Sequence, residues 1–220
     1  MSKLYIVATP IGNLEDITLR ALRILKEVDL IACEDTRVTK KLLDHYQIGK
    51  PLSSFHQHSR IFKIDFLINE IKKGKNIALV TDAGTPGISD PGGVLVAEAV
   101  KNNIPLEPIP GPSALATLIS VSGIPMEKFY FYGFLPHKKG KQTIIKELIG
   151  SRYPVVFFES RHRMIKTLEM LKTESDKVNL IVGRELTKKF ETIYRGNISD
   201  TIEQIKKDCE KGEFVVIVYK

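Results

Sequence analysis

The chain has 220 residues, of which 43% are hydrophobic, and this is enough for one large or two small globular domains. No apolar run approaches the roughly 20 residues that span a bilayer, and the start MSKLYIVATPIGN holds a short apolar strand instead of a signal peptide. We therefore expect a cytoplasmic protein with no membrane partner. The formal net charge of +7 favours an anionic partner and fits a nucleic acid better than a small metabolite.

The first half of the chain alternates short apolar runs with amphipathic stretches, a pattern typical of βαβ units and a mainly parallel sheet. Strands are predicted at residues 4–8, 29–33, 76–81 and 104–109. Helices are predicted where apolar residues recur at helical spacing, at residues 14–28, 38–46, 61–71 and 94–100. Asn13 is the predicted N-cap of the first helix.

A change of composition at PIPGPSA, residues 108–114, indicates a domain boundary. Three prolines and a glycine in this segment make a stiff connector, followed by a predicted helix over 113–121. We expect an N-terminal α/β domain at residues 1–110 and a C-terminal α/β domain at residues 111–220.

The second half is also predicted to be α/β. Strands are expected at 129–134, 155–159, 179–183 and 214–219, and helices at 142–149, 162–171 and 199–209. The segment ETIYRG, residues 191–196, is a further candidate strand that we expect to pair antiparallel with the last one, which would make this sheet mixed. Among several lysine clusters, HKKGK at residues 137–141 is the strongest candidate for a basic contact surface, because it follows the aromatic run FYFYGF.

The segment VTDAGTPGISDPGG, residues 80–93, carries four glycines and two prolines directly after a predicted strand. Glycine allows positive φ and close approach of a ligand, while proline fixes φ, so the segment predicts a rigid loop and not a helix or strand. Ligands of open α/β sheets bind at the carboxyl ends of the strands. This loop is therefore the first candidate for a binding site.

Standard site signatures fail on this chain. GISDPG has the spacing of the start of a P-loop, but Gly93 and Val94 stand where the lysine and the hydroxyl residue would be. The first strand runs into TPIGN instead of G-x-G-x-x-G, which removes the main support for a nicotinamide cofactor. Cys33 and Cys209 form no C-x-x-C pair, and His56 and His58 have no third ligand nearby, so neither a disulfide nor a metal site is expected.

What remains is a set of loops at predicted strand ends: TPIGN, EDTR, SFHQHS, TDAGTPGIS and PIPGPSA. The proline and glycine loops offer main-chain groups and little charge, which suits a ligand without a phosphate chain. EDTR, residues 34–37, and SFHQHS supply acids, histidines and an arginine for a second substrate. The simpler interpretation of EDTR is equally open, in which Asp35 or Thr36 caps the next helix and Glu34 pairs with Arg37 in solvent.

Long ordered motifs give the chain a resemblance to a known family: TPIGNLEDITLRAL, ACEDTR, TDAGTPGISDPG, PIPGPSA, FYGFLP, FFESRHR, GRELTK and GEFVVIV. With these the chain resembles the bacterial ribosomal RNA small subunit methyltransferase I family of the tetrapyrrole methylase superfamily, the class III S-adenosylmethionine-dependent methyltransferases. The resemblance implies two α/β domains with S-adenosyl-L-methionine in the cleft between them, and a homodimer. It also implies 2′-O-methylation of a cytidine in the decoding region of 16S rRNA within the small ribosomal subunit.

The resemblance also implies site residues. Cofactor contacts fall on Pro10, Gly84, Thr85, Pro86, Ile88, Ser113, Ala114 and Glu159 or its neighbour Phe158, with a residue of 183–186 completing the adenine pocket. Asp35 falls where relatives of the superfamily place a proposed base, so it is the first candidate for the catalytic base. Glu34, Arg37, His56 and Glu159 are orienting or alternative groups.

Three further expectations stay open at this point. Arg161, His162 and Arg163 are candidates for phosphate contact, or are simply the solvated start of a helix. The chain stops at Lys220, whereas relatives usually continue with a basic segment, so no RNA affinity from such a segment is expected. The alternative functions are a precorrin-type tetrapyrrole C-methyltransferase of the same fold and a non-catalytic ribosome-binding factor.

Overall fold

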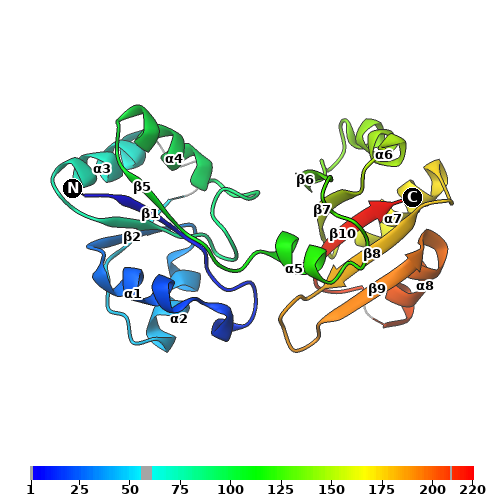
Figure 1. The fold of residues 1–220 in the computed structure, drawn as a ribbon, viewed down its shortest axis with the longest axis horizontal. Helices are drawn as coiled ribbons and strands as arrows, with labels where there is room; N and C mark the ends of the chain where they lie inside the picture. The colour runs from blue at the N-terminus through cyan, green and yellow to red at the C-terminus, as the bar shows by residue number, and fades with distance from the viewer. Residues whose placement is uncertain (1, 56–60, 209) are drawn as a thin grey trace. The chain divides into compact units, whose positions relative to one another are not determined.

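The computed structural model describes residues 2–55, 61–208 and 210–220. The chain divides into two compact units, Met1–Ser113 and Ala114–Lys220, each with its own sheet (Figure 1). In the described ranges, no helix combines the length and the apolar character that crossing a membrane requires. Each unit is described by itself below.

The first unit is a five-stranded sheet in which every neighbouring pair is parallel. Its strands follow the order β3-β2-β4-β1-β5 and span Leu4–Val7 (β1), Leu30–Cys33 (β2), Leu52–Ser54 (β3), Ile77–Leu79 (β4) and Leu106–Ile109 (β5). The mainly parallel sheet predicted for this half is confirmed. Strand β3 escapes the prediction because it has three residues, two of them serines, and owes its place to pairing with β2.

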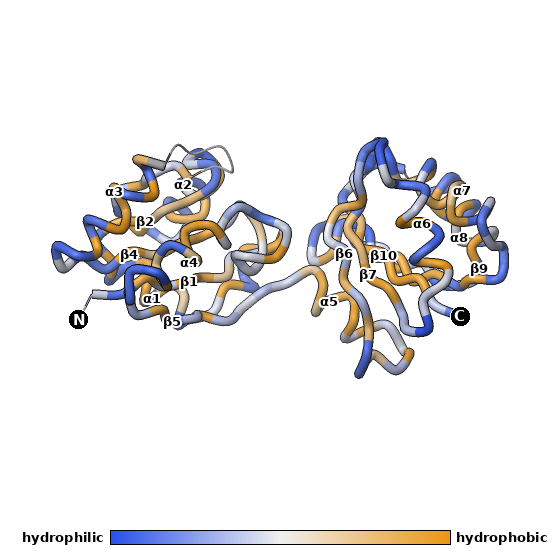
Figure 2. The backbone as a smooth tube through the Cα atoms, turned by 90° about the horizontal axis from the view of Figure 1, so that it is seen from above, coloured by the Kyte–Doolittle hydropathy of each residue, from blue (hydrophilic) through white to orange (hydrophobic). Residues whose placement is uncertain are grey.

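Helices cover both faces of this sheet, which is how a parallel sheet buries its apolar strands. One face packs against α1 (Leu19–Glu27) and α2 (Thr36–His45), and the other against α3 (Ile61–Lys72) and α4 (Gly92–Lys101). In Figure 2 the central strands are among the more apolar segments of the tube.

The first helix begins later than the sequence predicts. Asn13 does act as an N-cap, but its side chain accepts from the Glu15 amide and caps only the short 3₁₀ turn Leu14–Asp16 (η1). The α-helix starts at Leu19, where the Thr18 hydroxyl accepts from the Ala21 amide. Two hydroxyl or amide caps in succession divide one apolar stripe into two helices.

The second unit contains a mixed five-stranded sheet in the order β6-β7-β10-β8-β9. The strands are Tyr130–Phe134 (β6), Val155–Ser160 (β7), Asn179–Arg184 (β8), Thr192–Asn197 (β9) and Glu213–Tyr219 (β10). Only β6 and β7 are parallel, and the other three pairings are antiparallel. The predicted mixed sheet is confirmed, but the predicted pairing of ETIYRG with the last strand is wrong, because β10 lies between β7 and β8 while β9 pairs with β8.

Helices α6 (Lys141–Gly150), α7 (Met164–Glu174) and α8 (Ile198–Asp208) cover one face of this sheet. Near the end of β8, Leu118 of α5 (Ala114–Ser120) packs so closely on Gly183 that a Cβ there would lie 2.9 Å from its Cδ1 atom. Leu186 is equally close to Gly183 and is buried. Gly183 is therefore needed for packing between α5 and the sheet.

Tyr194 of β9 makes the second unit sensitive to alkaline pH. Burial, together with the hydrogen bond that its hydroxyl donates to Asp208, raises the pKa of Tyr194 to about 12. An unfolded tyrosine ionises near pH 10, so this side chain's contribution to stability is complete below about pH 10 and is lost between about pH 10 and pH 12. We expect the stability advantage of the wild type over Tyr194→Phe to shrink across that window in urea unfolding. A constant difference from pH 8 to pH 12 would contradict this assignment.

Candidate active site

The carboxyl ends of all five strands of the first unit lie at one edge of its sheet, because the strands are parallel. The connection after β4 leads to α4 on one face, whereas the connections after its neighbours β1 and β2 lead to α1 and α2 on the other face. Adjacent strands whose connections diverge in this way leave a crevice outside their carboxyl ends, which is where open α/β sheets bind ligands.

The glycine loop is joined to the loop after β1 by an isolated antiparallel bridge. The Thr9 amide donates to the Gly84 carbonyl at 2.9 Å, and the Gly84 amide donates to the Thr9 carbonyl at 3.0 Å. The Thr9 hydroxyl also donates to the Thr81 carbonyl at 3.0 Å. Pro10 and Gly84 are therefore held close together at the carboxyl edge of the sheet.

The same loop reaches the connector that follows β5. The Thr85 hydroxyl donates to the Pro112 carbonyl at 3.0 Å. Gly84 has a φ of +87°, and a Cβ there would lie 3.4 Å from Ile11 Cγ2 and 3.8 Å from the Pro112 carbonyl oxygen. Three of the predicted cofactor segments thus meet around a glycine that no β-branched residue can replace without strain.

Asp90 holds the far end of the glycine loop. Its two carboxylate oxygens accept from the amides of Gly87 at 2.8 Å and Gly92 at 2.6 Å, and the latter begins α4. Pro86 is buried, and the Ile88 amide donates to the Thr85 carbonyl at 3.3 Å. The only carboxylate of residues 84–93 is thus used within the loop, and what residues 84–93 offer a ligand is mainly main chain.

This donor set fits S-adenosylmethionine better than a nucleotide with a phosphate chain. Residues 80–93 contain no lysine or arginine that would neutralise phosphates. Pro10, Gly84, Thr85, Pro86 and Ile88 lie on the two loops that the Thr9–Gly84 bridge joins, and they offer main-chain and apolar groups there. Ser113 closes the first unit and Ala114 begins α5 in the second, so these two predicted contacts fall at the junction of the two units.

Asp35 of the EDTR segment is the N-cap of α2, as the simpler interpretation of that segment predicts, but Arg37 pairs with Asp35 and not with Glu34 as that interpretation expects. Its Oδ1 accepts from the Arg37 amide at 2.8 Å, and its Oδ2 lies 2.6 Å from Arg37 Nη2. Hydrogen bonds from the Arg37 side chain, and then from its amide, lower the pKa of Asp35 to about 2. Asp35 is ionised at neutral pH, but a carboxylate with so low a pKa is a weak proton acceptor.

Two side-chain contacts connect EDTR to the segment after β4. The Thr81 hydroxyl donates to Glu34 Oε2 at 3.3 Å, and the Asp35 amide donates to Asp82 Oδ1 at 2.9 Å. Glu34 and Asp35 are thereby brought to the same edge as the glycine loop. The Arg37 side chain pairs with Asp35 and is 86% exposed. His56, the fourth predicted catalytic residue, lies outside the described residues.

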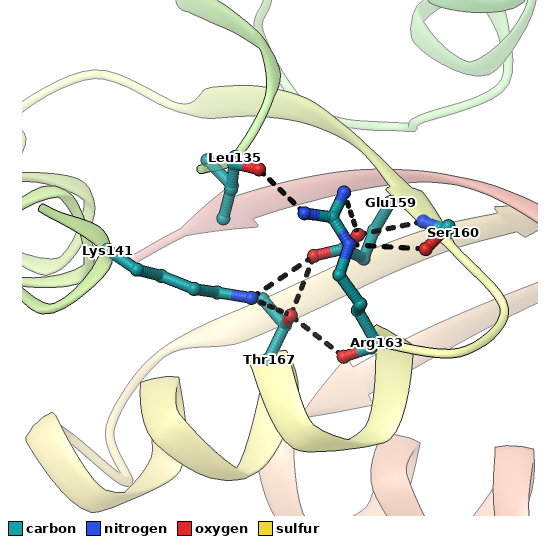
Figure 3. Close-up of polar contacts among 6 residues, drawn as sticks. All are labelled: Leu135, Lys141, Glu159, Ser160, Arg163 and Thr167. Carbon is teal, nitrogen blue, oxygen red and sulfur yellow. Dashed lines mark hydrogen bonds and ion pairs between the residues drawn. The ribbon is translucent and has the colours of Figure 1, made fainter. Parts of the chain in front are cut away.

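Glu159, a predicted cofactor contact, is at the centre of a buried ionic cluster in the second unit (Figure 3). The residue is 1% exposed, and its carboxylate oxygens lie 2.7 Å from Arg163 Nη2 and 3.4 Å from Lys141 Nζ. The Thr167 hydroxyl and the Ser160 amide also donate to it, at 2.7 and 2.8 Å. The carboxylate is fully occupied, which leaves the main chain at this position, or Phe158, for a ligand.

The cluster removes Lys141 from the basic surface expected at residues 137–141, whereas His137, Lys138 and Lys139 are exposed. Lys141 is only 6% exposed, and its ammonium group donates to Thr167 Oγ1 at 2.7 Å. Burial lowers the pKa of Lys141, and the nearby Glu159 opposes that shift. Arg163 likewise points inward, donating to the Leu135 carbonyl at 2.9 Å. Lys141 and Arg163 therefore stabilise the fold and are not available to bind RNA.

A groove of about 1020 Å³ lies at the carboxyl ends of β7 and β8 in the second unit. Arg184 and Lys188 in its wall are paired with Asp208, Glu185 and Glu213. Arg161, which donates to His162 Nε2 at 3.0 Å, and Lys189 also line it. Phe190 is 64% exposed beside Lys189, whose ammonium lies 5.6 Å from the ring centroid.

Among the described residues, no group of three or more histidine, cysteine or acidic side chains could hold a metal ion.

Comparison with known proteins agrees with this architecture. The family model for tetrapyrrole (corrin/porphyrin) methylases matches residues 3–202. Solved structures with this fold include diphthine synthase, with a TM-score of 0.77 at 15% identity over 100% of this chain and 90% of that one. Another is uroporphyrin-III C-methyltransferase from Thermus thermophilus in complex with S-adenosylhomocysteine, with a TM-score of 0.65 at 16% identity over 98% and 97%. The chain belongs to the tetrapyrrole methylase family, a family of methyltransferases.

Within that family, similarity in sequence is much higher to proteins named ribosomal RNA small subunit methyltransferase I. One from Mycoplasmopsis pulmonis is 46% identical over 100% of this chain and 98% of its own length. One from Escherichia coli O157:H7 is 43% identical over 98% of this chain but only 77% of its own length. The expectation that relatives extend further therefore holds for the second of these proteins and not for the first.

Proposed function

We propose that this chain uses S-adenosyl-L-methionine to methylate the ribose 2′-hydroxyl of a cytidine in the decoding region of 16S rRNA. The observation that carries the proposal is the meeting of three loops at the sheet edge of the first unit, where the Thr9–Gly84 bridge and the Thr85–Pro112 hydrogen bond bring the segments with the predicted cofactor residues together. The names of the full-length relatives support a ribosomal RNA substrate. Such a substrate would place the enzyme in the cytoplasm, and a homodimer is part of the proposal.

S-adenosylmethionine, when bound, supplies an electrophilic methyl group on a sulfonium. Pro10, Gly84, Thr85, Pro86 and Ile88 would hold it through main-chain and apolar contacts, with Ser113, Ala114 and the main chain at Glu159 as further candidates. Orientation of the reacting groups is the main task of such a site, since well-placed reactants gain roughly 7–11 kcal/mol. The Asp35–Arg37 pair, rigidly fixed at the start of α2, is suited to orient the ribose, and Glu34 stands beside it.

The RNA itself would be bound by positive charge and by stacking. The net charge of +7 attracts a polyanion. In the second unit, Arg161, His162 and Lys189 border the groove together with the exposed ring of Phe190. Exposed aromatic rings next to cations are typical platforms for unpaired bases.

Incubation of unmodified small ribosomal subunits with radiolabelled S-adenosylmethionine tests the proposal. We expect one methyl group per subunit, on a ribose. Because 2′-O-methylation protects the neighbouring phosphodiester from alkaline cleavage, partial alkaline hydrolysis of the RNA then maps the methylated nucleotide. Transfer to a precorrin-type macrocycle instead would identify a tetrapyrrole C-methyltransferase. Failure to bind S-adenosylmethionine in a calorimetric titration, with retained binding to small subunits, would identify a ribosome-binding factor.

A further inference from the structure

Three acidic side chains meet at the sheet edge of the first unit. Glu34 and Asp35 follow β2, and Asp82 follows β4, the strand next to it. A hydroxyl group that attacks a methyl donor must lose its proton, and a positioned carboxylate is one of the groups that accept protons in enzymes. The three carboxylates differ in how many hydrogen bonds and ion pairs their oxygen atoms already make.

Asp35 is the most occupied of the three. Both of its oxygens accept from the Arg37 side chain, and Oδ1 also caps α2. A proton arriving on this carboxylate would have to displace the guanidinium and weaken the cap. Glu34 accepts from the Thr81 hydroxyl.

Asp82 is anchored through one oxygen. Its Oδ1 accepts from the Asp35 amide at 2.9 Å, a bond that fixes the side chain between the EDTR segment and the glycine loop. Within the ranges that the structure describes, Asp82 has no ion pair, and Oδ2 accepts no hydrogen bond. The side chain is partly exposed, so Oδ2 is both held in place and accessible.

The position of Asp82 along the chain brings it close to the proposed methyl donor. Only Ala83 separates it from Gly84, so the two Cα atoms are at most about 7 Å apart even for extended backbone. Gly84 is fixed by its bridge to Thr9, so Asp82 is held through its side chain by the Asp35 amide and through the main chain by Gly84.

We propose that Asp82 is a catalytic residue that accepts the proton of the attacking ribose hydroxyl on its Oδ2 atom. This inference rests on the proposed function. As the hydroxyl oxygen forms its bond to the methyl carbon, the carbon–sulfur bond breaks and its electron pair goes to sulfur. The hydroxyl proton passes to the Asp82 carboxylate and then to water, which regenerates the base. Asp35 then acts as a positioning residue, because its amide orients Asp82.

Asp82→Asn is the decisive variant, because asparagine keeps an oxygen that can accept from the Asp35 amide but cannot take up the proton. With saturating S-adenosylmethionine and unmodified small subunits, we expect kcat to fall about 10²–10⁴-fold. The affinity for S-adenosylhomocysteine, measured by calorimetry, should stay within about threefold of the wild type. Asp44→Asn is the matched control, since that exposed carboxylate only pairs with Lys40 on α2 and its removal should leave kcat unchanged.

A second variant separates proton transfer from structure. Asp82→Ala should be as inactive as Asp82→Asn, and added formate should restore part of its activity in proportion to concentration, whereas chloride should not. The assignment is overturned if Asp82→Asn keeps kcat within about threefold, if either variant loses S-adenosylhomocysteine binding together with activity, or if formate has no effect. A wild-type chain that transfers no methyl group to small subunits would overturn the proposed function as well.

Discussion

Replacing Glu159 with alanine should lower the free energy of unfolding of the second unit by about 3–5 kcal/mol, because removing one partner from a buried ionic cluster leaves uncompensated charge in the interior. Lys141 and Arg163 would both stay buried, without the carboxylate that their nitrogen atoms contact at 3.4 and 2.7 Å. Urea unfolding followed by circular dichroism measures the change, since the chain has no tryptophan to report by fluorescence.

The matched control for this prediction is Glu169→Ala. Glu169 pairs with Lys206 at 2.7 Å, but about half of each side chain is exposed, with 52% for the glutamate. Surface pairs of this kind contribute about 0–1 kcal/mol. Equal losses for the two variants would show that the buried cluster contributes no more than a surface pair.

Gly84→Val should weaken the binding of S-adenosylhomocysteine about 10- to 100-fold, corresponding to a loss of about 1.4–2.8 kcal/mol. Valine resists the φ of +87°, and its Cβ would press on Ile11 and on the Pro112 carbonyl, so the loop must move. Such a movement breaks the exchange of hydrogen bonds with Thr9 that places Pro10 at the site.

Gly74→Val provides the comparison for Gly84→Val, because Gly74 has a similar φ of +101° but no heavy atom within 4 Å of the point that a Cβ would occupy. Gly74→Val should lower the free energy of unfolding by about 1–2 kcal/mol, because valine resists a positive φ, without changing the affinity for S-adenosylhomocysteine. If both variants bind equally well, the glycine loop is not part of the cofactor site.

Much of the fold was predictable from local patterns. The strands of the first unit other than β3 are short and largely apolar, the stripes of α1 to α4 follow helical spacing, and the glycine and proline loop between β4 and α4 could not be regular structure. The cap at Asp35 was one of two interpretations of EDTR, because an acid before a helix can equally cap it or serve a ligand, and the sequence does not show that the Asp35 carboxylate accepts from both the amide and the side chain of Arg37.

The features that the sequence did not reveal depend on contacts between distant residues. In the sequence, Lys141 does not differ from the other lysines of a basic loop. In the structure its ammonium group is buried and contacts Glu159, which lies on a strand eighteen residues away. The apolar run of β10 suits a buried strand, but its pairing with both β7 and β8 follows from packing of the whole sheet and not from the run itself. The free oxygen of Asp82 is visible only once the Asp35 amide is seen to hold the other.

The central position of β10 also determines when the second unit can fold during synthesis. Until residues 213–219 leave the ribosome, β6 with β7 and β8 with β9 are two separate halves of a sheet, each with an unpaired apolar edge. The first unit has all five of its strands within its own 113 residues and can fold well before that moment. A nascent chain that is released early would therefore carry a finished first unit and an aggregation-prone second one.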